Sequence, residues 1–123
     1  MDKTRLRKPA CLVLVRHEVI AEDLALTLQD AFGKGPIMVC RSPEEALERL
    51  PDVSDLQVAV VETDPDTFAG SRLETEITAR GGQVVLFGEL AETRMPAGRW
   101  PVLHRPFTDE MVLNLLSRFD ERT

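Results

Sequence analysis

The feature of this chain that most limits its fold is a regular alternation between short apolar runs and segments with helical periodicity. The apolar runs are residues 10–15 (ACLVLV), 37–40 (IMVC), 57–61 (QVAVV), 83–87 (QVVLF) and 101–103 (PVL). They are mostly aliphatic and lack the polar alternation of a half-exposed strand, so each run predicts a strand that is covered on both faces. Such strands are typical of a parallel sheet with helices on its two sides.

The intervening segments carry helix-start signals and one-sided apolar spacing. Residues 20–32 place an apolar side chain at every fourth position, which predicts the first helix. Ser42 and Glu45 have the spacing of a capping box at the start of the second helix. A third helix follows residues 70–71, and Thr108 is the expected cap of the last helix. The apolar residues expected to face the sheet are Ile20, Leu24, Leu28, Phe32, Ala46, Leu47, Leu50, Leu73, Ile77, Val112, Leu115, Leu116 and Phe119.

The connection between residues 88 and 100 is the least regular part of the pattern. Residues 90–94 allow about one helical turn, because Pro96 and Gly98 oppose a longer helix. Five strand–helix units therefore predict a three-layer α/β/α domain, a doubly wound parallel sheet with a shortened fourth helix and right-handed crossovers. The chain of 123 residues has the length of one domain. We assign residues 10–120 to this domain and residues 1–9 to a basic N-terminal arm.

Composition narrows the class of protein further. The chain has 15 Lys and Arg against 21 Asp and Glu, and this net charge of -6 argues against an extended nucleic-acid-binding face. The longest apolar run falls far short of the roughly 20 residues that cross a bilayer, and no signal-peptide core follows the basic N-terminus. We therefore expect a cytoplasmic protein that binds neither nucleic acid nor membrane. Cys11 and Cys40 lie in separate apolar runs and are expected to be buried thiols rather than metal ligands.

Parallel α/β sheets bind their ligands beyond the carboxyl ends of the strands, which directs attention to the residues at those ends. These residues are Arg16, His17, Glu18, Glu62, Gly88 and Arg105. Arg16 and Glu62 are expected at neighbouring strand ends, with Arg105 arriving from the other side. They predict a fixed salt-bridge network around Glu62. The alternative is a set of solvated loop charges, each pair contributing about 0–1 kcal/mol.

These residues, taken with their spacing, resemble the receiver domain of bacterial two-component response regulators. Arg105-Pro106-Phe107, followed by a capped helix, is similar to the Lys-Pro-Phe of that family, and residues 42–50 (SPEEALERL) resemble its second helix. Glu62 stands where the family has its phosphoacceptor aspartate, and Gly70 matches a glycine of the family. The resemblance covers nearly the whole chain. It implies a flavodoxin-like fold with strand order 2-1-3-4-5.

The same resemblance implies that the phosphorylation chemistry is lost. Receivers hold Mg2+ with three carboxylates and use a hydroxyl residue and a lysine. Here Arg16 and His17 replace the acidic pair, Gly88 replaces the hydroxyl residue and Arg105 replaces the lysine. We therefore expect neither Mg2+ nor any other cofactor, no metal site and no catalytic residue.

The function expected from this resemblance is that of a pseudo-receiver in two-component or phosphorelay signalling. It would act through protein–protein contacts without being phosphorylated, and it would not be an enzyme. The expected partner is a signalling protein such as a histidine kinase, or a second copy of the chain. Trp100, Val102 and Phe107 are candidates for the interface, although packing in the core would explain them equally well.

Two alternatives remain open from the sequence. Residues 12–18 (LVLVRHE) also resemble the opening of histidine phosphatases and phosphoglycerate mutases, in which the histidine, here His17, is a nucleophile. That family has a longer chain with additional arginines. The second alternative is a receiver that still accepts phosphate on Glu62 or Asp64.

Overall fold

The structure is a computed structural model, and it describes residues 9–32, 35–93, 100–103, 108 and 110–114. Five parallel strands form one sheet in the order β2-β1-β3-β4-β5. The strands are β1 (Ala10–Leu14), β2 (Ile37–Cys40), β3 (Leu56–Glu62), β4 (Gln83–Phe87) and β5 (Val102–Leu103). The predicted α/β architecture and strand order are therefore confirmed.

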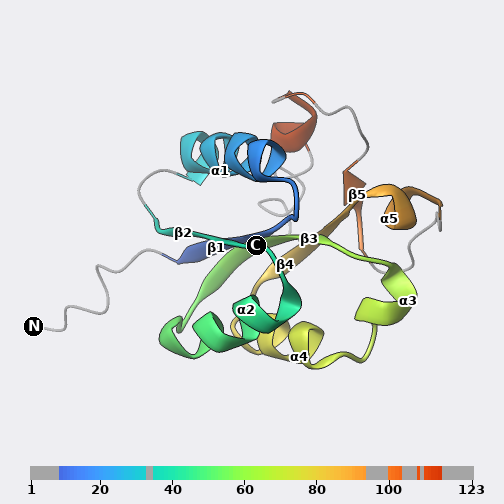
Figure 1. Cartoon of the computed structure of the whole chain (residues 1–123). Coiled ribbons are helices and arrows are strands. Elements are labelled where there is room, and N and C mark those ends of the chain that lie inside the picture. Colours follow the sequence, from blue (N-terminus) through green and yellow to red (C-terminus); the bar gives the residue numbers. More distant parts are fainter. Residues whose placement is uncertain (1–8, 33–34, 94–99, 104–107, 109, 115–123) are drawn as a thin grey trace, which may run out of the picture.

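Helices cover both faces of this sheet (Figure 1). The elements are α1 (Glu18–Phe32), α2 (Pro43–Arg49), the 3-10 turn η2 (Leu50–Asp52), α3 (Pro65–Phe68), α4 (Arg72–Ala79) and α5 (Glu89–Thr93), and residues 110–114 are also helical. Figure 1 places α1 and the helical residues 110–114 over one face and α2 and α4 over the other. The expected short fourth helix corresponds to α5. Among the described residues, no helix has the length and apolar character needed to cross a membrane.

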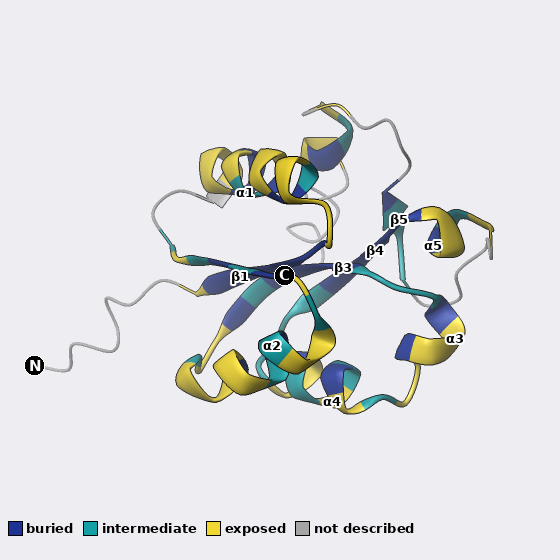
Figure 2. Ribbon diagram, in the orientation of Figure 1, coloured by how far each residue is buried: buried dark blue, intermediate teal, exposed yellow. Residues whose placement is uncertain are grey.

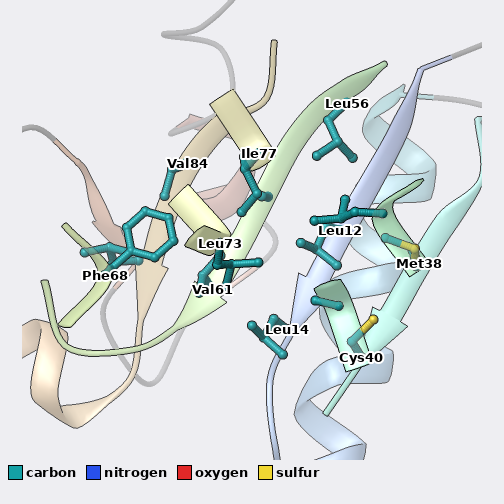
Figure 3. Close-up of a cluster of buried hydrophobic side chains, with 14 of the residues drawn as sticks. Leu12, Leu14, Met38, Cys40, Leu56, Val61, Phe68, Leu73, Ile77 and Val84 are labelled. Atoms are coloured by element: carbon teal, nitrogen blue, oxygen red, sulfur yellow. The ribbon is translucent and has the colours of Figure 1, made fainter. Parts of the chain in front are cut away.

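The alternation of side chains along the strands divides the core into two layers. In β1 all five residues are buried; Leu12 and Leu14 join one cluster, whereas Cys11 and Val13 join the other. Figure 2 shows the strands as mostly buried, and Figure 3 shows the cluster beneath α2 and α4. The uninterrupted apolar runs are thus explained by a sheet without a solvent-facing side.

Cys11 and Cys40 are both free and buried, as expected, and they lie in different core layers. Burial raises the pKa of the Cys11 thiol to about 11, partly offset by a backbone hydrogen bond from Val58. Burial also raises the pKa of Cys40. Both thiols are therefore protonated near neutral pH and serve as small apolar core residues.

The predicted helix caps are present. The hydroxyl of Ser42 accepts the N–H of Glu45 at 3.1 Å, while Glu45 Oε1 accepts the N–H of Arg41 at 2.9 Å, one residue before the cap. Thr108 Oγ1 accepts the N–H of Met111 at 3.1 Å at the start of the last helical segment. The sequence-predicted starts of these two helices are therefore satisfied by local hydrogen bonds.

The short helix α3 was not predicted from the sequence. The carboxylate of Asp64 caps it by accepting the N–H of Asp66 at 3.0 Å. At its other end the ring of Phe68 contacts Trp100 edge-on, with ring centroids 5.0 Å apart and an interplanar angle of 76°. This contact joins the segment after β3 to the segment before β5.

Arg80 connects the end of α4 to the turn after α2. Its guanidinium Nε donates to the carbonyl of Leu50 at 3.1 Å and to that of Val53 at 2.8 Å, and Nη1 donates to Glu76 Oε1 at 2.6 Å. The side chain is only 16% exposed. Arg80 therefore satisfies backbone carbonyls that water reaches poorly.

We expect Arg80→Ala to lower the free energy of unfolding by about 1–3 kcal/mol, because it leaves partly buried carbonyls without a donor. Arg72→Ala is the matched control, since Arg72 is exposed at the start of the same helix. Denaturant unfolding of both variants measures the difference. Equal losses in the two variants would contradict this role of Arg80.

Candidate functional site

The carboxyl ends of β1 and β3 bring Arg16 and Glu62 together. The two strands are parallel neighbours, and Leu14 pairs with Val61 near their ends. Glu62 is the last residue of β3, and Arg16 lies two residues beyond β1. The sheet register therefore sets these residues side by side, as predicted from the sequence.

Glu62 is held mainly by the backbone of Arg16. The N–H of Arg16 donates to Glu62 Oε1 at 2.8 Å, whereas the guanidinium Nη2 lies 3.7 Å from Oε2. The Arg16 side chain is 75% exposed and that of Glu62 is 23% exposed. An exposed guanidinium at that distance contributes little, while a charge-assisted bond to the backbone has a fixed geometry. The sequence predicted the ion pair but missed the backbone hydrogen bond.

Glu18 lies near this site in sequence but is paired elsewhere. It opens α1, and its Oε1 lies 2.8 Å from Nη2 of Arg41, which follows β2. Both side chains are largely exposed. Glu18 therefore faces Arg41 rather than Glu62.

His17 marks the start of α1 rather than the floor of a pocket. Its carbonyl accepts the N–H of Ala21 at 2.9 Å, and the residue is exposed. It lines neither of the two cavities described below. His104, the other histidine of the chain, lies outside the described residues.

Gly88 follows β4 and lies directly against Glu62. Its φ of +106° is in the region that side chains rarely adopt, and a Cβ built on it would lie 3.0 Å from Glu62 Cγ. The atom approached is part of the longer glutamate side chain. Glycine at position 88 therefore fits both the local backbone and the extra methylene of Glu62.

Two small cavities flank Glu62. One has a volume of about 180 Å3 and extends toward Gly88 and α5; the other has a volume of about 260 Å3 and extends toward Arg41 and α3. The residues common to both are Arg16, Glu62, Thr63 and Leu90. Of the carboxylates in the larger cavity, Asp64 is already used as the cap of α3. The site is thus a shallow, mixed-charge edge divided by the Glu62 side chain.

The structure describes only some of the other candidate residues. Within the described ranges, no three His, Cys, Asp or Glu side chains come together as a metal site would require. Trp100 and Val102 are half-buried and pack against the core cluster beneath α2 and α4. Arg105 and Phe107 lie outside the described residues, so the predicted contact between Arg105 and Glu62 stays a prediction.

Comparison with known proteins adds no family assignment: neither a protein-family model nor a curated protein matches this chain.

The close approach of Gly88 to Glu62 predicts how much a side chain at position 88 lowers the free energy of unfolding. Gly88→Ala should cost more unfolding free energy than Gly70→Ala, because Gly70 also has positive φ (+76°) but a Cβ there meets nothing within 4 Å. The control isolates the backbone cost, about 1–2 kcal/mol.

A double-mutant cycle then isolates the contact itself. In a Glu62→Ala background the excess cost of Gly88→Ala over Gly70→Ala should shrink, since the Cγ atom is gone. Denaturant unfolding of the single and double variants provides the measurement. An excess that is unchanged without the Glu62 side chain would show that the contact is unimportant.

Proposed function

We propose that this chain is a divergent, receiver-like signalling domain of the two-component type that acts by protein–protein contacts without phosphorylation. The observation that carries the proposal is the state of Glu62, whose carboxylate accepts the Arg16 N–H at 2.8 Å. At the position where a receiver would be phosphorylated, the carboxylate is bound within the protein. The confirmed strand order supports the same interpretation.

The residues around Glu62 do not fit the Mg2+ that receivers use. Mg2+ requires several hard oxygen ligands in near-octahedral geometry. The neighbouring strand end supplies Arg16, whose guanidinium lies 3.7 Å from Glu62, and Glu18 is paired with Arg41. A divalent cation at Glu62 would therefore face the positive charge of Arg16 at the strand end where a receiver has its acidic pair.

Attack by Glu62 on a phosphoryl donor is also disfavoured by geometry. The carboxylate is held to the Arg16 N–H, and its methylene contacts the position of Gly88. In-line transfer depends on close positioning of the attacking oxygen, which the longer side chain and this hydrogen bond alter. We therefore assign Glu62 a structural role at the edge, with no catalytic step in this domain.

In this account the signal is carried by a surface that a partner recognises. The partner class is a signalling protein such as a histidine kinase, with a second copy of the chain as the alternative. Trp100 and Val102, which lie before and in β5, and Phe107 from the sequence prediction remain the proposed contact residues. The half-exposed state of the first two leaves part of each available to a partner.

A titration of the intact chain with Mg2+ and then beryllofluoride tests the proposal, because beryllofluoride occupies the place of a phosphoryl group on an active receiver. We expect no saturable change in the amide resonances of Glu62, Thr63 and Gly88 at millimolar Mg2+. A phosphorylatable receiver domain, titrated in the same buffer, is the positive control. A saturable response localised to these amides would overturn the claim of phosphorylation independence.

A further inference from the structure

The larger of the two cavities beside Glu62 lies where sheets of this topology bind their ligands. The chain leads from β1 to β2 on one side and to β3, β4 and β5 on the other, so the strand order changes direction between β1 and β3. Ligands of doubly wound sheets bind beyond the strand ends at such a switch point. Arg16 follows β1, Glu62 ends β3, and both line the cavity of about 260 Å3. Sites for drug-sized ligands have roughly 300–1,000 Å3, so this cavity fits only a small molecule.

Charges of both signs line this cavity and balance one another. The charged side chains that line it, within the described part of the chain, are two cations and two anions: Arg16, Arg41, Glu62 and Asp64. A ligand with charge of one sign would therefore meet repulsion as well as attraction. A small zwitterion can place each of its charges against an opposite charge of the protein.

Both guanidinium groups are accessible to a ligand carboxylate. The side chain of Arg16 is 75% exposed, and its guanidinium lies 3.7 Å from Glu62, beyond hydrogen-bond distance. Arg41 uses Nη2 for Glu18 in an exposed ion pair, which is a weak interaction, and a guanidinium has five N–H donors in all. The two arginines can therefore bind a carboxylate, whose geometry matches the guanidinium fork.

Of the two described carboxylates in the cavity, Glu62 is the better acceptor for an ammonium group. Its Oε1 accepts the N–H of Arg16, whereas Oε2 faces only the distant guanidinium. The oxygens of Asp64 are both occupied, Oδ1 by the N–H of Asp66 and Oδ2 by the hydroxyl of Thr67. A ligand ammonium would therefore bind Glu62 Oε2 without breaking the bond at Oε1.

Leu90 adds an apolar wall to the same cavity. Its side chain is 58% exposed, which is unusual for a large apolar residue, and Pro43 lines the cavity with it. An apolar group of a ligand that covers Leu90 would remove this surface from water, which is favourable.

We propose that this cavity binds a small α-amino acid with an apolar side chain. The carboxylate binds Arg16 and Arg41, the ammonium binds Glu62 Oε2, and the apolar side chain lies against Leu90. This inference goes beyond the proposed function and does not depend on it. The ligand would lie beside α3 and α5, because Thr67 and Leu90 line the cavity.

A titration of the intact chain with L-leucine, followed by NMR, tests the proposal. We expect saturable shifts in the amide resonances of Arg41, Thr63 and Thr67 at millimolar ligand. Isocaproate lacks the ammonium of leucine and isoamylamine lacks its carboxylate, so each should bind at least about tenfold more weakly. No saturable response to L-leucine, or equal affinity for either analogue, would overturn the proposal.

Two variants identify the residues that make the contact. Arg16→Gln keeps the backbone N–H that holds Glu62 and removes the guanidinium, and it should bind L-leucine about tenfold more weakly. Leu90→Ser should reduce the preference for L-leucine over glycine, because the apolar contact is lost.

The matched control is Arg72→Gln, which removes the same charge at an exposed position that lines neither cavity. This variant should bind L-leucine as the original chain does. An affinity for L-leucine that is unchanged in Arg16→Gln would overturn the proposal. A preference over glycine that is unchanged in Leu90→Ser would overturn it as well.

Discussion

The hydrogen bond from the Arg16 N–H to the carboxylate of Glu62 joins the ends of β1 and β3, which are neighbours in the sheet. It fixes the segment between β1 and α1 against the end of β3 at a distance of 2.8 Å. That segment sets where α1 begins, and β3 ends where α3 is capped. At the carboxyl edge, the ends of β1 and β3 are therefore tied together by one backbone donor and one carboxylate.

Glu62 restricts which residues fit beside it. Its additional methylene occupies the space beside Gly88, where a larger residue would meet Glu62 Cγ. Its carboxylate uses the N–H of Arg16, and the guanidinium of the same residue remains mostly in solvent. Arg16, Glu62 and Gly88 thus form one compatible set. Changing Glu62 or Gly88 alters the requirement at the other residue, whereas Arg16 contributes through a backbone N–H that every residue except proline supplies.

The elements of the fold could be predicted from the sequence because their causes are local or periodic. Strands that are buried on both faces appear in the sequence as uninterrupted apolar runs. Helix caps such as Ser42 and Thr108 have fixed spacings to the residues whose N–H groups they accept. The helix α3 was missed because it has only four residues. Its start has a local signal, Asp64 as the cap before Pro65, whereas the contact of Phe68 with Trp100 joins residues far apart in the chain and has no signature in the sequence.

In the candidate site, too, some features could be predicted from the sequence and others could not. Sequence reasoning placed Arg16, Glu62 and Gly88 at one edge, because parallel strands bring their carboxyl ends together. It assigned the interaction to two charged side chains, however. The donor is a backbone N–H, whose direction is set by the loop after β1 and has no signature in the residue types. The approach of Gly88 to Glu62 likewise depends on the pairing of β3 with β4.

The most direct test of this account is the amide resonance of Arg16, followed by NMR as acid protonates Glu62. A carboxylate that accepts this N–H shifts its proton downfield, and protonation weakens the bond. We expect the Arg16 amide proton to move upfield as Glu62 is protonated, and to lose this response in Glu62→Gln. An Arg16 amide that does not respond to acid, or responds equally in Glu62→Gln, would contradict the internal bond on which the account rests.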